Sequence, residues 1–144
     1  MNINDTIVSQ STPKGVGPTA VIRISGKNSI DIVNKIFPSK DLNKVDSHTL
    51  HFGSIIYDKV IIDEVVISIF KEPRSYTKEN IVEISCHGSE IIIKKIILSL
   101  IDLGARTAER GEFTFRSFIN GNIDLSQAEA VSDLISGKSE NAHK

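Results

Sequence analysis

Glu83 and Arg23 are charged residues placed within otherwise apolar strands, IVEIS and VIRIS. A carboxylate in such a strand is costly to bury unless it is paired. Glu83 therefore faces solvent, forms a salt bridge, or accepts two hydrogen bonds from a planar ring with adjacent N–H donors, as in pterins and guanines. Arg23 either pairs with Glu83 or holds an anionic or carbonyl-bearing ligand. We predict that the stretch SYTKENIVEISCHG, from Ser75 to Gly88, is the centre of a small-molecule binding site.

Other kinds of site have weaker support. The sequence contains neither a G-x-x-x-x-G-K-[ST] loop nor a G-x-G-x-x-G loop, so we do not expect this chain alone to hydrolyse a nucleotide. Cys86 and His87 are adjacent at a strand end and point to opposite faces, which disfavours a shared metal ion. We interpret His87-Gly88 as a turn from strand to helix, with a site-lining role for His87 as the alternative. No catalytic residue and no metal ligand is predicted.

The two charged residues are predicted to lie on strands of a mixed sheet. Strands are predicted at residues 5–10, 19–25 and 80–87. Residues 48–70 favour a β-hairpin that turns at Tyr57-Asp58-Lys59. Because the second arm of this hairpin has apolar residues on both faces, we expect it to be central in its sheet.

Helices and loops fill the intervals between these strands. Helices are predicted over 28–37, ended by Pro38; over 88–104, capped by Ser89 and Gly104; over 111–120, ended by Gly121; and from Asp124 onward, with a capping box completed by Gln127. Residues 40–47 are predicted to be a polar connection. The helix over 88–104 is apolar almost all round, so we expect deep burial. The last helix has no clear stop before Lys144, which suggests a piece of a longer protein. The fold class expected is α+β, a mixed sheet with about three packed helices.

The bulk composition is that of one soluble domain. The 144 residues are 40% hydrophobic and 24% charged, and the formal net charge is −1. This charge argues against a stand-alone nucleic-acid binder, which needs a basic surface. One cysteine excludes an internal disulfide and fits a reducing compartment. With no signal peptide and no apolar run long enough to span a bilayer, a cytoplasmic protein is expected.

Several long motifs, standing in a fixed order, resemble one known family. They are DTIVSQSTP, VIRISG, DEVVISIFKEPRSYTKENIVEISCHG, RGEFTFRSFINGNIDLSQAEAVSDLI and KSENA. Together they look like the N-terminal domain of the tRNA-uridine modification GTPase family MnmE, also called TrmE. The resemblance covers nearly the whole chain and is weakest across residues 38–60.

The resemblance implies a function for the domain and for the protein that contains it. The family's N-terminal domain binds 5-formyl-tetrahydrofolate or methylene-tetrahydrofolate, forms the homodimer contact, and has a fold similar to the folate-binding domain of aminomethyltransferases. A helical domain with an inserted GTPase domain follows, and that GTPase domain uses GTP, Mg²⁺ and K⁺. With the flavoprotein MnmG (GidA), the family installs aminomethyl-type groups, including 5-carboxymethylaminomethyl, on the wobble uridine of certain tRNAs. No contact with a membrane is implied.

The resemblance also assigns residues of the site. Arg23 and Glu83 match the folate-contacting arginine and glutamate of the family. Asn122 stands where the family has a folate-contacting lysine, so this contact lacks a positive charge. Further departures from the family pattern are Lys78, Asn80, Ser89 and Arg110. They bear on affinity more than on the fold.

The resemblance divides the chain in two and leaves rivals open. Residues 1–121 are expected to form the folate-binding, dimerising domain, and residues 122–144 the start of the helical domain. The first rival is a folate-dependent aminomethyltransferase-like or repair protein on the same fold. The second is a dimerisation module that has lost folate binding, and a weaker third is a direct tRNA binder.

Overall fold

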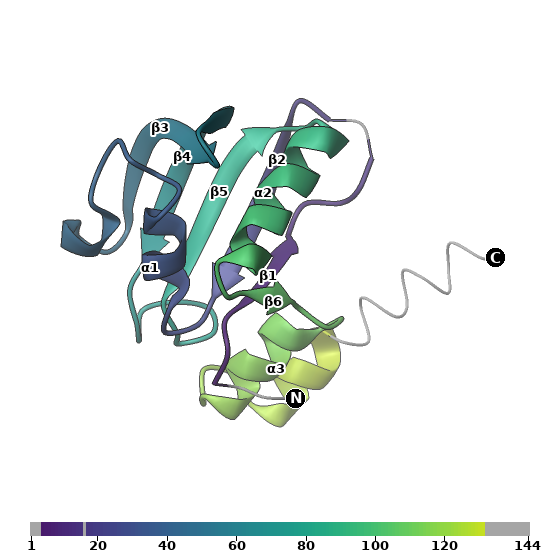
Figure 1. Cartoon of the computed structure of the whole chain (residues 1–144). Coiled ribbons are helices and arrows are strands. Elements are labelled where there is room, and N and C mark those ends of the chain that lie inside the picture. The colour runs from purple at the N-terminus through teal and green to yellow at the C-terminus, as the bar shows by residue number, and fades with distance from the viewer. Residues whose placement is uncertain (1–3, 16, 132–144) are drawn as a thin grey trace.

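Six strands form one mixed sheet in this computed structural model, which describes residues 4–15 and 17–131 (Figure 1). The strands are β1 (Ile7–Gln10), β2 (Thr19–Ser25), β3 (Thr49–Tyr57), β4 (Val60–Phe70), β5 (Ile81–His87) and β6 (Arg106–Thr107). Their order across the sheet is β3-β4-β5-β2-β1-β6. Only β1 and β6 pair in parallel, and the other neighbours are antiparallel. The α+β class with a mixed sheet is confirmed.

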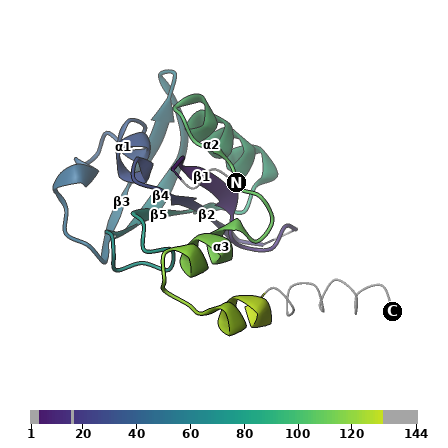
Figure 2. The ribbon, with the colours of Figure 1, turned by 90° about the horizontal axis from the view of Figure 1, so that it is seen from below.

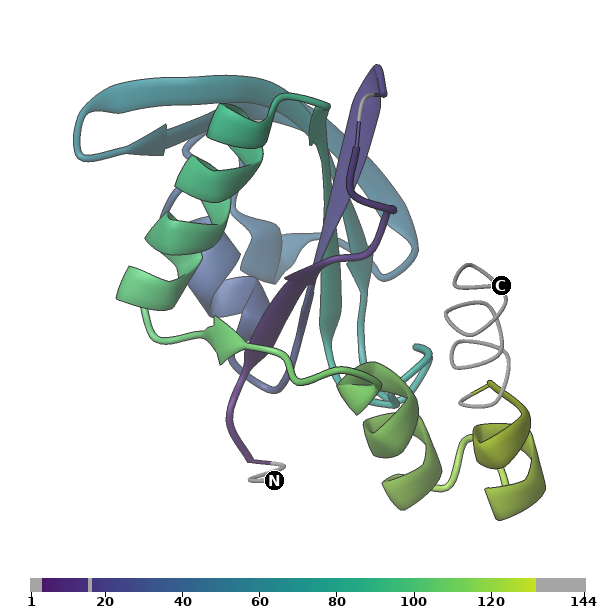
Figure 3. The same ribbon diagram turned by 90° about the vertical axis from the view of Figure 1, so that its right-hand side faces the viewer.

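The sheet has one core face and one half-buried face. Alternate residues of β2 and β5, among them Ile22, Ile24, Val82 and Ile84, are fully buried on the first face. Helices α1 (Ser29–Asn34) and α2 (Glu90–Asp102) lie on this side of the sheet (Figure 3). Because successive side chains on a strand point to opposite faces, Arg23, paired in register with Glu83, lies with it on the second face.

The hairpin of β3 and β4 is the predicted one. Asp58 and Lys59 connect the strands with φ of 51° and 64°, the left-handed backbone that a type I′ two-residue turn requires. Strand β4 lies between β3 and β5, so the expectation of a central strand is confirmed.

The first helix is shorter than predicted, and the connection after it is less polar. Helix α1 ends at Asn34, and Lys35, Ile36 and Phe37 donate backbone hydrogen bonds to carbonyls three residues back, the tight geometry common at helix ends. Leu42 begins a short 3₁₀ helix, Leu42–Lys44, and is fully buried. Its backbone N–H donates to the Asn34 side chain at 2.8 Å.

The expectation that α2 is deeply buried is wrong. Only Ile96, Ser99 and Leu100 are buried, whereas Ile91 is 67% exposed and Leu98 is 53% exposed. The physical reason is that α2 packs on the sheet through a single stripe, and nothing in the described part of the chain covers its outer side. The Ser89 cap is confirmed, since its hydroxyl accepts from Ile92 N–H at 3.4 Å.

The turn between β5 and α2 depends on Gly88, as predicted. Its N–H donates to the Pro18 carbonyl at 3.1 Å. A Cβ at this position would lie 1.9 Å from the carbonyl oxygen of Gly17. A glycine is therefore required by the close approach of two backbones.

The last described segment lies below the sheet. Helix α3 (Glu112–Ile119) lies beside the loop that precedes β5 (Figure 2). The capping box is confirmed, because Asp124 N–H donates to the Gln127 side chain at 2.9 Å and Gln127 N–H donates to Asp124 at 2.8 Å. Residues 125–131 are helical. The expected continuation of this helix and the KSENA motif lie outside the described residues.

Candidate functional site

Arg23 and Glu83 form an ion pair on the half-buried face of the sheet. They are direct cross-strand partners on β2 and β5, and Arg23 Nε donates to Glu83 Oε2 at 2.9 Å. Their side chains are 27% and 24% exposed. The other carboxylate oxygen of Glu83, Oε1, accepts no hydrogen bond from the described residues. The pair thus neutralises both charges and leaves one acceptor available to a ligand.

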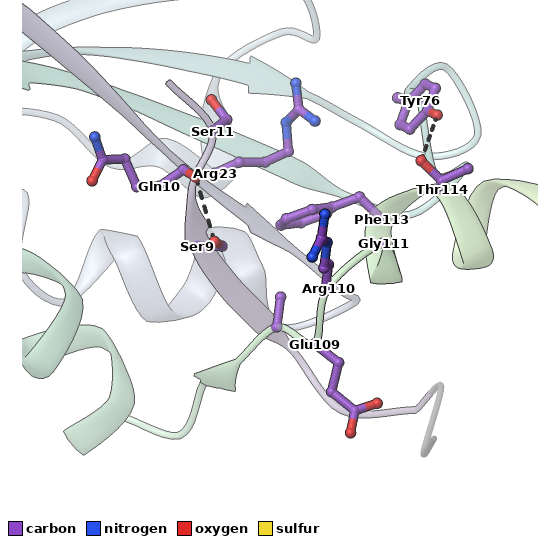
Figure 4. A pocket seen from close by; sticks show the side chains of 11 residues that line it. Ser9, Gln10, Ser11, Arg23, Tyr76, Glu109, Arg110, Gly111, Phe113 and Thr114 are labelled. Atoms are coloured by element: carbon purple, nitrogen blue, oxygen red, sulfur yellow. Dashed lines mark hydrogen bonds between the residues drawn. The ribbon is translucent and has the colours of Figure 1, made fainter. Parts of the chain in front are cut away.

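A pocket of about 560 Å³ opens next to this pair, on the side of Arg23. It is lined by Ser9, Gln10, Ser11, Arg23, Tyr76, Ala108, Glu109, Arg110, Gly111, Phe113 and Thr114. Figure 4 shows Arg23 and Phe113 reaching toward the same space from the sheet and from α3. The Arg23 guanidinium carbon lies 5.4 Å from the Phe113 ring centre and 6.0 Å from that of Tyr76, within cation–π range. Glu83 is the cross-strand partner of Arg23 and is not among the residues that line the pocket.

Asn122 supports the wall of this pocket from outside. Its Nδ2 donates to the Tyr76 carbonyl at 2.9 Å and to the Ser117 hydroxyl at 3.1 Å. Ser117 also donates to the Tyr76 carbonyl, and the Tyr76 and Thr114 hydroxyls share a hydrogen bond of 3.1 Å. The structure thus brings Arg23 and Glu83 together, and it connects Asn122 to the site only through Tyr76.

A buried cluster of charged side chains, centred on Arg116, holds α3 in place. The sequence patterns predicted no role for Arg116. The guanidinium of Arg116 is fully buried and bonds Asp5 at 2.8 Å, Glu79 at 3.1 Å and Glu112 at 3.3 Å. Arg106 bonds Asp5 at 2.5 Å and Glu112 at 2.6 Å. The spacing of Glu112 and Arg116, four residues apart on a helix, was the local signal for one of these pairs. The other pairs join segments that are distant in sequence.

The cluster lowers the pKa of two carboxyl groups. The hydrogen bond from Arg106 is the main cause of the lowered pKa of Asp5, against an opposing effect of burial. At Glu112 burial acts to raise the pKa, but the hydrogen bonds from Arg106 and from Glu109 N–H, with the nearby positive charges, outweigh it and lower the pKa. Both carboxylates are therefore ionised at neutral pH.

Cys86 and His87 both make contacts that stabilise the fold, Cys86 in the core and His87 with Asp63 of β4. Cys86 is buried in the core, and burial raises the pKa of its thiol to about 11. The Asp63 carboxylate accepts from His87 N–H at 2.9 Å and contacts His87 Nδ1 at 2.8 Å, which ties the turn to β4. Within residues 4–15 and 17–131 no cluster of histidine, cysteine and acidic residues could hold a metal ion. No helix in the same ranges has both the length and the apolar character of a membrane span.

Comparisons with known proteins agree over almost the whole chain. The family described as "GTP-binding protein TrmE N-terminus" matches residues 6–122. A protein named tRNA modification GTPase MnmE from Cytophaga hutchinsonii is 51% identical over 143 residues, which are 99% of this chain and 31% of that protein. Its namesake from Flavobacterium psychrophilum is 54% identical over 147 residues, 100% of this chain and 32% of that protein. The chain thus spans about a third of the length of these curated relatives.

Proposed function

This chain belongs to the GTP-binding protein TrmE N-terminus family, and from that premise we propose that it is a tetrahydrofolate-binding and homodimerising domain of a tRNA modification GTPase. The observation that carries the proposal is the Arg23–Glu83 pair beside an aromatic-walled pocket. In this proposal the ligand is 5-formyl-tetrahydrofolate or methylene-tetrahydrofolate. Residues 1–121 constitute the domain, and residues 122–144 begin a helical domain.

The residues present fit a folate in size, shape and chemistry. A volume of about 560 Å³ lies within the common range for small-molecule pockets, about 300–1,000 Å³. Phe113 and Tyr76 offer apolar surface against which a flat ring can pack. Glu83 Oε1 is an acceptor for an N–H group on the ring edge, and Arg23 can donate to a ring carbonyl.

Asn122 has a narrower role in the proposal than Arg23 and Glu83. Its Nδ2 donates to the Tyr76 carbonyl and the Ser117 hydroxyl, so in this proposal it assists folate binding by stabilising the aromatic wall. When bound, the folate supplies a one-carbon unit, and the chain's own residues bind and orient it.

The dimerisation part of the proposal is supported by the edge strand β3. Leu50 and Phe52 are 70% and 69% exposed on neighbouring same-face positions of this strand. Exposed apolar residues on a free sheet edge favour pairing with another chain. Light scattering tests this, since the double variant Leu50→Ser/Phe52→Ser should be monomeric. A matched control, Leu98→Ser on α2, should leave the oligomeric state unchanged.

The remaining parts of the proposal concern the longer protein. The relatives are named tRNA modification GTPases, and we propose that the longer protein couples GTP hydrolysis to tRNA modification. We propose that it uses Mg²⁺ and K⁺, modifies wobble uridine together with MnmG, and is cytoplasmic.

Isothermal titration calorimetry with 5-formyl-tetrahydrofolate tests the binding proposal. The unaltered chain should bind, and Glu83→Ala should abolish binding because the ring loses its carboxylate partner and Arg23 loses its orienting contact. The control Glu64→Ala removes an exposed carboxylate from the neighbouring strand β4 and should bind normally. Normal binding by Glu83→Ala would refute the assigned site. Absence of heat with the unaltered chain would instead favour a pure dimerisation module.

A further inference from the structure

We infer that the backbone N–H of Gln10 donates a hydrogen bond to the formyl oxygen of 5-formyl-tetrahydrofolate, so that the pocket prefers this form to the methylene form. This inference rests on the proposed function and deepens it by choosing between its two ligands. The two forms differ at the ring nitrogen N5, which carries a carbonyl-type oxygen only in the 5-formyl compound. A site that separates them therefore needs a hydrogen-bond donor at that point.

The backbone hydrogen-bonding groups of Gln10 face away from β2. Ser11 N–H donates to the Val21 carbonyl on β2 at 2.8 Å. Along an antiparallel pair of strands, residues that exchange hydrogen bonds alternate with residues that do not, so Gln10 turns its N–H and its carbonyl to the other edge of β1. Val8 does the same, since its carbonyl accepts from Ala108 N–H at 2.9 Å.

Strand β6 ends before it reaches Gln10. The register of β1 and β6 stops at the pair Val8 and Thr107, and Gln10 N–H has no acceptor among residues 4–15 and 17–131. Gln10 is half-buried and, together with Ala108, lines the pocket. A backbone N–H removed from water is costly unless it is bonded, which favours a ligand acceptor at this point of the pocket wall.

The side chain of Gln10 is engaged elsewhere, so the contribution of Gln10 to the pocket is its backbone. Its Nε2 donates to the Thr12 hydroxyl and to the Pro13 carbonyl, both at 3.3 Å. Figure 4 shows the carboxamide directed away from the Phe113 ring. The backbone donor and the side chain can therefore be tested by separate substitutions.

Arg23 and the Gln10 N–H are neighbouring donors on paired strands. Ser9, which precedes Gln10, is the direct cross-strand partner of Arg23, and the Arg23 guanidinium carbon lies 5.4 Å from the Phe113 ring centre. In a reduced pterin the ring carbonyl and the substituent on N5 project from the same edge of the ring. With the ring against Phe113, Arg23 can hold the carbonyl while Gln10 N–H holds the formyl oxygen.

Nuclear magnetic resonance of the unaltered, isotope-labelled chain tests this contact directly. The probes are 5-formyl-tetrahydrofolate and 5-methyl-tetrahydrofolate, which carries a carbon on N5 but no oxygen and does not release formaldehyde as the methylene form does. The 5-formyl compound should move the Gln10 amide proton downfield and slow its hydrogen exchange, and the 5-methyl compound should do neither. The Ser11 amide, bonded to Val21, is the internal control and should be protected in every state.

Calorimetry with the same two compounds measures the effect on affinity. The unaltered chain should bind the 5-formyl compound about fivefold more tightly, as expected for one hydrogen bond between neutral groups. Gln10→Pro removes the N–H at a strand edge, where proline is tolerated, and should abolish this preference without weakening the 5-methyl compound. Gln10→Ala is the matched control, because it keeps the N–H and should keep the preference.

Three results would each overturn the inference while leaving the proposed function in place. They are equal binding of the two compounds by the unaltered chain, a Gln10 amide signal that 5-formyl-tetrahydrofolate does not change, and a preference that survives in Gln10→Pro. If the proline variant fails to fold, the amide signal of the unaltered chain decides. If the unaltered chain binds neither compound, the proposed function itself fails and the inference fails with it.

Discussion

Replacing Arg116 by methionine should destabilise the fold more than any surface substitution. The Arg116 guanidinium is fully buried, and its partners are the Asp5, Glu79 and Glu112 carboxylates and the Asp5 carbonyl, which accepts at 2.7 Å. Methionine fills a similar volume but leaves Asp5 and Glu112 with Arg106 as their cation and takes away the ion pair that Glu79 makes with Arg116. Removing one partner from a buried ionic group costs about 3–5 kcal/mol, because the other charges stay desolvated.

Urea unfolding followed by circular dichroism measures this cost, since the chain has no tryptophan. With a denaturant slope of about 2 kcal/mol/M, the midpoint should fall by about 2 M. Arg74→Met is the matched control because Arg74 is exposed in a loop, and its midpoint should stay near that of the unaltered chain. A loss below about 1 kcal/mol for Arg116→Met would refute the reasoning and would mean that the cluster rearranges or admits water.

Three further predictions concern pH, the β5–α2 turn and the thiol. The pKa values of Asp5 and Glu112 are lowered in the folded state. Their ionised forms therefore stabilise the fold at pH values above the ordinary carboxyl pKa, and this stabilisation is lost as the pH falls through their pKa values in the folded protein. The urea midpoint should decrease below about pH 4. Gly88→Ala should lower the free energy of unfolding by about 1–3 kcal/mol, since its Cβ would meet the Gly17 carbonyl oxygen at 1.9 Å. The control Gly17→Ala should be tolerated, because the nearest contact of its Cβ is at 3.8 Å. Equal losses of stability in the two variants would contradict the close approach of the backbones at Gly88. Cys86, with burial and a pKa of about 11, should react with a thiol reagent at pH 8 more than about a hundredfold more slowly than after unfolding, and rapid native labelling would contradict the buried placement.

Local patterns predicted the parts of the fold that depend on neighbouring residues. The alternation in VIRIS and IVEIS placed Arg23 and Glu83 each on the less apolar face of its strand, and their pairing was one of the alternatives considered. The capping box at Asp124 and the glycine at position 88 were also correct for local reasons. The motif order identified the family, which the comparisons confirm.

Long-range packing could not be predicted in the same way. The hydrophobicity of residues 91–103 shows that a helix is apolar but does not show what covers it, so the burial of α2 was overestimated. The Arg116 cluster joins Asp5 and Glu79 to α3 across 111 and 37 positions of the sequence, and no periodic pattern carries such contacts. Phe113 and Tyr76 are far apart in the sequence, and their common position around Arg23 follows only from the packing of α3.

The parallel pairing of β1 with β6 has a consequence for folding during synthesis. Ile7 pairs with Arg106, and Asp5 is bonded to residues 106 and 116, so the first strand completes its contacts only after nearly the whole domain has left the ribosome. The β3–β4 hairpin, whose partners are close in sequence, can form much earlier. The wall of the pocket that α3 provides is therefore among the last parts to be assembled. A nascent chain that stalls before residue 116 would have most of its sheet but an incomplete pocket.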